Sequence, residues 1–149
     1  MYDVRRRTNI KIVTTSWRAP VEAAMFLRVG ISRMPPRQLR GYRTYAPLYP
    51  GRWWREISGA AEWASRYLED LDRLDPGKVL DDLAAMVRDG RGIALCCWEA
   101  PPPSAEWCHR GLVSSWLHSR LDFAVPELGH EDSGCGRCHP MLHASMRSA

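Results

Sequence analysis

Hydrophobic and polar residues fall into blocks along the chain, and three short apolar blocks have the character of buried strands. They occupy residues 10–15 (IKIVTT), 25–31 (MFLRVGI) and 92–98 (GIALCCW), and polar residues or breakers follow each of them. β-branched residues favour extended backbone, and an apolar run bounded by glycine is typical of a strand covered on both faces. The pattern therefore predicts three buried strands, with residues 123–126 as a candidate for a short edge strand.

Three other segments have apolar residues at helical spacing. The first runs from about residue 52 to residue 74 and stops at Asp75-Pro76-Gly77, and the second covers 79–87 and stops at Asp89-Gly90. A third follows the proline run 101–103, with Ser104 as its cap and an apolar inner face. That face consists of Leu112, Val113, Trp116 and Leu117.

Strands that alternate with helices predict an α/β domain with a mostly parallel sheet. We expect a Rossmann-like, three-layer arrangement, a short sheet with helices on both of its faces. A length of 149 residues suits a single domain. It divides into a basic arm at 1–9, the α/β domain at 10–128, and a loosely structured tail with cysteine and histidine at 129–149. Within the domain, the tyrosines and prolines of 41–51 predict a long ordered loop.

Ligands of open parallel sheets bind beyond the carboxyl ends of the strands. Polar residues follow all three predicted strands there, and the segment Cys108-His109-Arg110 opens the last helix. A helix N-terminus attracts anions and lowers the pKa of a cysteine, so Cys108 is the candidate nucleophile, with Glu99 and His109 as acid–base candidates. The candidate ligand-binding residues are Ser16, Trp17, Ser32, Arg33, Arg37 and Arg110. The alternative is structural: Cys108 and His109 as core residues, and Glu99 with Arg110 as an ion pair.

Several of these segments resemble the family called domain of unknown function 488. The matching motifs are KIVTTSW (11–17), VGISRMPPR (29–37), YAPL (45–48), ALCCWE (94–99) and CHRGLVSSWL (108–117). The resemblance covers about 11–128, and the chain departs from it by a longer, proline-rich insertion at 100–107. The resemblance implies a compact α/β domain and no particular activity. It also implies a shared polar site on Ser16, Ser32, Arg33, Glu99, Cys108, His109 and Arg110.

The formal net charge is +4, and the positive residues are concentrated in one region. No acidic residue occurs between 33 and 55, where arginines alternate with aromatic rings, a composition that stacks bases and neutralises phosphates. The candidates for a nucleic-acid surface are Arg40, Arg43, Tyr45, Arg52, Trp53 and Arg55. The alternative places these rings in the core and the arginines on a solvated surface.

The five cysteines are an odd number, and the chain shows no export signal, so we expect reduced thiols and a cytoplasmic protein. No apolar run approaches the roughly 20 residues that a membrane span needs. In the tail, Cys135, Cys138 and His143 have spacings that suit a structural zinc ion. CGRCH also fits a haem-attachment pattern, but that attachment normally needs export, so no haem is expected. Any other cofactor remains unknown.

Three functions are compatible with these features. The first is an enzyme or enzyme-like domain for a nucleotide or another phosphorylated, anionic ligand. The second is a nucleic-acid-binding module, and the third a thiol-based or zinc-dependent sensor. The chain contains no Walker loop, no GxSxG elbow and no HExxH helix, so the mechanisms that depend on them have no motif here.

Overall fold

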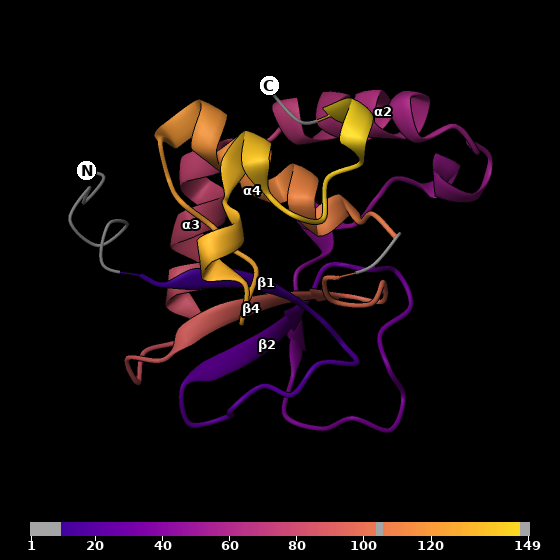
Figure 1. Cartoon of the computed structure of the whole chain (residues 1–149). Helices are drawn as coiled ribbons and strands as arrows, with labels where there is room; N and C mark the ends of the chain where they lie inside the picture. Colours follow the sequence, from indigo (N-terminus) through magenta and orange to yellow (C-terminus); the bar gives the residue numbers. More distant parts are fainter. Residues whose placement is uncertain (1–9, 104–105, 147–149) are drawn as a thin grey trace.

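The strands form one parallel sheet, shown in Figure 1. The computed structural model describes residues 10–103 and 106–146, so the predicted arm at 1–9 and Ser104 lie outside the described residues. The strands are β1 (Ile12–Ser16), β2 (Phe26–Gly30), β3 (Arg43–Thr44) and β4 (Gly92–Cys97), in the spatial order β1-β4-β2-β3. Every pairing is parallel, and Ile93 of β4 is in register with Ile12 of β1 and Leu27 of β2. The predicted α/β class with a parallel sheet is confirmed.

The three strands predicted from apolar runs are β1, β2 and β4. All six residues of β4 are buried, as a central strand between two neighbours requires. The short strand β3 lies in the region predicted to be a loop, and its two residues are exposed and carry no apolar signal. The predicted edge strand at 123–126 is wrong. The chain instead meets β1 slightly later, at a single parallel bridge between Thr14 and Glu127.

The α-helices in residues 10–103 and 106–146 are α2 (Ala60–Asp72), α3 (Pro76–Ala85) and α4 (His109–Leu121). The first starts later than its apolar spacing predicts, because residues 52–55 form a separate 3-10 turn. Asp75 caps α3, since its side chain accepts hydrogen bonds from the backbone N–H groups of Gly77 and Lys78. Cys108 is the N-cap residue of α4, which places His109 and Arg110 in its first turn.

All three helices lie on one face of the sheet (Figure 1), so the expected helices on both faces are a wrong prediction. The large core lies between these helices and one face of the sheet. The opposite face carries a smaller cluster around Trp17 and Phe26, packed against loop residues such as Leu39 and Tyr42. No helix forms in the connections that flank β2, at 17–25 and 31–42, which contain Pro20, Pro35 and Pro36. Loops therefore form this second layer.

The tail is better ordered than its composition predicts. His139, Met141 and Leu142 are buried, and the backbone N–H of Cys108 donates to the Met141 carbonyl over 2.9 Å. The tail therefore packs beside the start of α4 and closes the core there. Within the described residues, none of the helices combines the length and the apolar character that crossing a membrane requires.

Candidate functional site

A pocket of about 650 Å³ opens beyond the carboxyl ends of β2 and β4. Glu99, which follows β4, and His109, the first residue of α4, both line it. The full lining is Ser32, Arg33, Met34, Pro35, Pro36, Arg37, Gln38, Pro50, Trp54, Trp63, Trp98, Glu99 and His109. The pocket lies where ligands of open parallel sheets bind, and Ser32, Arg33, Arg37, Glu99 and His109 are the predicted site residues in its lining.

Three tryptophans give the pocket flat apolar walls. The Trp98 ring is 38% exposed, and its indole N–H donates to the Met34 carbonyl over 2.6 Å. The indole N–H of Trp63 donates to the Trp54 carbonyl over 3.0 Å, and its ring lies against the His109 ring with centroids 6.0 Å apart. Fixed rings of this kind offer stacking surfaces to a planar ligand. Sequence reasoning missed all three, although Trp98 directly precedes Glu99 in the chain.

Charged groups of both signs face the same pocket. The side chains of Arg33 and Arg37 belong to exposed residues, and Nε of Arg33 donates to the Pro50 carbonyl over 2.6 Å. Among the described residues that line the pocket, Glu99 alone carries a carboxyl group. Burial raises the pKa of Glu99 above its ordinary value, while the positive charge of Arg110 lowers it in part. The site therefore combines two guanidinium groups, which can pair with anions, with a half-buried carboxyl group, which can exchange a proton.

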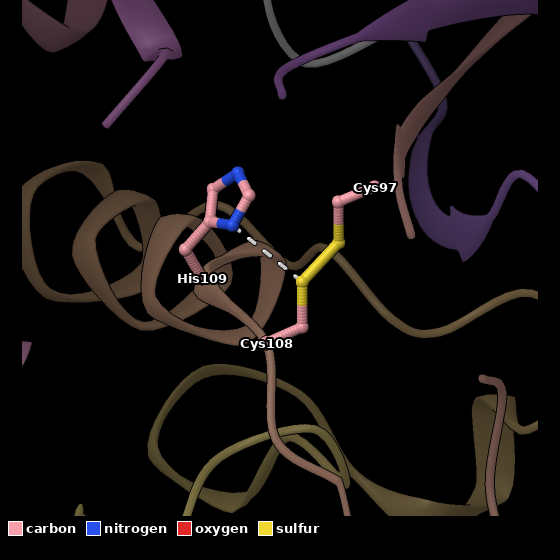
Figure 2. A group of neighbouring side chains, drawn as sticks. All are labelled: Cys97, Cys108 and His109. Carbon is pink, nitrogen blue, oxygen red and sulfur yellow. Dashed lines mark hydrogen bonds between the residues drawn. A yellow bond between two sulfur atoms is a disulfide. The ribbon is translucent and has the colours of Figure 1, made fainter. Parts of the chain in front are cut away.

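The hydrogen-bond partner of His109 indicates which of its ring nitrogens carries the proton. Its Nε2 lies 2.9 Å from the Ile31 carbonyl oxygen, which only accepts hydrogen bonds, so Nε2 carries the proton and donates. Burial lowers the pKa of His109 to about 4, while the Ile31 hydrogen bond raises it in part. Its Nδ1 therefore presents a lone pair, and this atom lies 3.6 Å from Sγ of Cys108 (Figure 2). The ring also packs edge-on against Tyr67.

Cys108 is joined to Cys97 by a disulfide bond (Figure 2), so the expectation of reduced thiols throughout is wrong. The bond ties the last residue of β4 to the N-cap of α4, and in this state Cys108 has no thiol to act as a nucleophile. The odd number of cysteines did not indicate this pair, because one disulfide uses two of the five cysteines and leaves three of them free. Those are Cys96, Cys135 and Cys138. Burial raises the pKa of Cys96 to about 12.

Arg110 lies behind the pocket rather than in its lining. It is fully buried and forms a two-point ion pair with Glu127, over 2.8 Å at both contacts. Its Nη1 also donates to the Glu99 carbonyl over 3.0 Å, and Nη2 donates to the Ala100 carbonyl over 3.3 Å. Arg110 is therefore placed to fix the backbone that carries Glu99. Nothing in the sequence indicated Glu127 as its partner.

Ser16 and Trp17 also lie behind the pocket. The Trp17 indole N–H donates to Oγ of Ser32 over 3.2 Å, and Oγ of Ser16 lies 3.5 Å from the Trp98 carbonyl. Both contacts support residues that line the pocket. Ser16 and Trp17 were predicted to bind the ligand. They do not line the pocket, and they instead contact Trp98 and Ser32, which do.

The predicted nucleic-acid surface divides into buried rings and exposed arginines. Tyr45 is buried, and its hydroxyl donates to Asp82 over 2.7 Å. Trp53 is half-buried, and its indole N–H donates to Asp70 over 2.8 Å. Arg40, Arg43, Arg52 and Arg55 are exposed. This arrangement is the one that the structural alternative described, because these two rings face the core rather than a bound base.

The tail does not form the expected zinc site in the described part of the chain. Cys135, Cys138 and His143 do not come together as a group of metal ligands, and Nδ1 of His143 instead contacts Oγ of Ser145 over 2.8 Å. The three-residue group with suitable spacing is Cys97, Cys108 and His109.

The family model DUF488-N3a, described as "Active DUF488-N3 subclade", matches residues 12–121. This range runs from the first residue of β1 to the last residue of α4 and contains every residue of the pocket lining. No curated protein and no solved structure matches the chain. The match therefore covers the whole sheet, the helices and the pocket, and leaves out the tail.

Proposed function

The chain belongs to the DUF488 family, and we propose that it is an enzyme that binds a nucleotide in the pocket and performs acid–base chemistry on it. The description of the matched subclade as active supports an activity for this domain. The pocket volume of about 650 Å³ is in the range of small-molecule sites, which supports a ligand of nucleotide size.

One observation carries the proposal: indole rings, guanidinium groups and a carboxyl group line the same pocket. A nucleotide has a planar base that stacks on aromatic rings and a phosphate that pairs with guanidinium groups. Trp98 and Trp63 offer the stacking surfaces, and Arg33 and Arg37 offer the charges. A purely apolar ligand could not pair with the positive charges of the two arginines.

In this proposal Glu99 is the catalytic residue. Its half-buried carboxyl group faces the pocket that holds the ligand, so it is in position to exchange a proton with a bound substrate. Arg110 and Ser32 are positioning residues. The first holds the backbone at Glu99, and the second links the pocket lining to Trp17.

Binding is tested by titrating the protein with adenosine monophosphate and with adenosine, following tryptophan fluorescence. We expect the monophosphate to bind more tightly, and Arg37→Ala to remove that preference. Trp98→Ala should weaken the binding of both by about 1–3 kcal/mol, the cost of losing one stacking ring. Arg40→Ala is the matched control, because Arg40 is exposed and does not line the pocket. If no common nucleoside monophosphate binds, or if Arg40→Ala costs as much as Arg37→Ala, the nucleotide proposal is wrong.

Turnover is tested separately, by chromatography of nucleotides incubated with the protein. Glu99→Gln keeps the size and the polarity of the side chain but removes the exchangeable carboxyl proton. We expect this variant to retain the affinity for the monophosphate and to lose conversion. Conversion at the wild-type rate by Glu99→Gln would leave the pocket but remove Glu99 from the chemistry.

A further inference from the structure

The disulfide belongs to a cluster with the composition of a metal site. The two Sγ atoms of Cys97 and Cys108 and a ring nitrogen of His109 all lie within 4.8 Å of one another, and all three residues are buried. We propose that this cluster, once its disulfide is reduced, binds a thiophilic divalent cation such as Zn²⁺ next to His109, which lines the pocket. This inference does not depend on the nucleotide proposal, since its three ligating side chains take no part in that proposal and its ligand is a different one.

The orientation of His109 is the first argument. A histidine that binds a metal through one ring nitrogen usually donates its other N–H to a carbonyl or a carboxylate, which fixes the tautomer. Here Nε2 donates to the Ile31 carbonyl over 2.9 Å. Nδ1 is left as the lone-pair atom and points at Cys108 from 3.6 Å (Figure 2).

The surroundings of the sulfur atoms are the second argument. Nη1 of Arg110 donates to Sγ of Cys97 over 3.1 Å, and Cys108 stands at the N-cap of a 13-residue helix. A guanidinium group and a helix N-terminus both stabilise a thiolate, which is the form of cysteine that binds metals. The charge of Arg110 is balanced by Glu127. Two thiolates, a neutral histidine and a divalent cation then add up to a neutral cluster, which is the condition for burying it.

The step from the observed state to the metal-bound state balances as follows. A dithiol reductant gives two electrons and two protons to the Cys97–Cys108 disulfide and closes into its own cyclic disulfide. The incoming cation then displaces the two thiol protons, which pass to water. Oxidation by a disulfide compound runs the first step backwards and expels the cation. The metal site and the disulfide are therefore two alternative states of one cysteine pair.

The test uses the full chain, reduced with dithiothreitol and then freed of it by gel filtration under nitrogen. Titration with Co²⁺ should produce the absorbance of a thiolate–cobalt bond, saturating at one ion per chain and disappearing when Zn²⁺ is added. The oxidised protein should give no such band. Cys97→Ser should abolish it. Cys96→Ser is the matched control, because Cys96 is the neighbouring residue on β4 and lies outside the cluster.

Two outcomes would overturn the proposal. One is a reduced, folded chain that gives no thiolate–cobalt band. The other is a band that disappears in the double variant Cys135→Ser and Cys138→Ser, because the tail would then be the site. A second measurement covers the case in which Cys97→Ser does not fold: alkylation of the reduced wild type, mapped by mass spectrometry. Bound Zn²⁺ should protect Cys97 and Cys108 and leave the reactivity of Cys135 and Cys138 unchanged.

Discussion

Arg110 and Glu127 form an ion pair in which both side chains are completely buried, with Nε and Nη2 each 2.8 Å from a carboxylate oxygen. Thr14 extends the network, since its hydroxyl donates to Oε1 of Glu127 over 2.8 Å. The pair joins the first turn of α4 to the chain segment beside β1. It thereby connects the backbone at Glu99 to the buried Thr14 of β1.

Glu127→Gln should destabilise the protein by about 3–5 kcal/mol, because it leaves the Arg110 charge buried without its counter-charge. Urea unfolding followed by circular dichroism measures the change. Lys78→Ala is the control: it breaks the largely exposed pair with Asp82, which should cost at most about 1 kcal/mol. Equal losses in the two variants would show that the Arg110 pair is not a special element of the fold.

The disulfide predicts a specific pattern of thiol reactivity. In the native, oxidised protein, alkylation should modify Cys138 and Cys135, which are exposed and half-exposed, and leave the buried Cys96 untouched. Unfolding without reductant should add Cys96, for three modified cysteines in all. Reduction and unfolding together should modify all five. Mass spectrometry counts the modifications, and five modified cysteines without reductant would mean that the bond between Cys97 and Cys108 is absent.

Local features of this fold have clear signals in the sequence, and long-range features do not. The strand β4 had a clear signal in its apolar run, whereas the cap expected at Ser104 did not mark the start of α4, which begins at His109 after Cys108. Glu99 and His109 both line the pocket beyond the carboxyl ends of the strands, where a ligand of an open parallel sheet is expected. Long-range partners had no such signal: the pairing of Arg110 with Glu127 and of Cys97 with Cys108 depends on how distant segments pack. The single helical layer was also missed, because local periodicity does not state which face of a sheet a helix covers.

Hydrogen bonds to Asp82 predict a pH-dependent contribution to stability. Partial burial alone raises the pKa of Asp82, but hydrogen bonds from the Tyr45 hydroxyl and from Lys78 outweigh it and lower the pKa below 3.8. A carboxyl group with a lowered pKa in the folded state stabilises the fold above its unfolded pKa, and this stabilisation is lost as the pH falls through the folded value. Tyr45→Phe should therefore cost about 0.5–1.5 kcal/mol at pH 7. At about pH 2 the difference in unfolding free energy between the wild type and Tyr45→Phe should be smaller. Unfolding curves of both proteins at pH 7 and at about pH 2 measure it. An equal difference at the two pH values would show that the hydrogen bond to Asp82 does not depend on the charge of Asp82.

Gly111 lies in the first turns of α4, where alanine would ordinarily stabilise a helix by roughly 0.5–1 kcal/mol over glycine. Here a Cβ atom would lie 3.0 Å from the backbone nitrogen of Leu142 and 3.0 Å from the carbonyl carbon of Met141, which belong to the packed tail. Backbone atoms cannot swing away as a flexible side chain does, so the tail or the helix must shift. We expect Gly111→Ala to destabilise the protein, although alanine has the higher helix propensity, and to loosen the segment 139–142.

Gly59→Ala is the matched control, because a Cβ at the N-cap of α2 meets nothing within 4 Å. The free energy of unfolding and the hydrogen exchange of the amides at 139–142 measure these two effects. A Gly111→Ala variant that is more stable than the wild type, with unchanged exchange at 139–142, would show that the tail does not pack against this turn of α4.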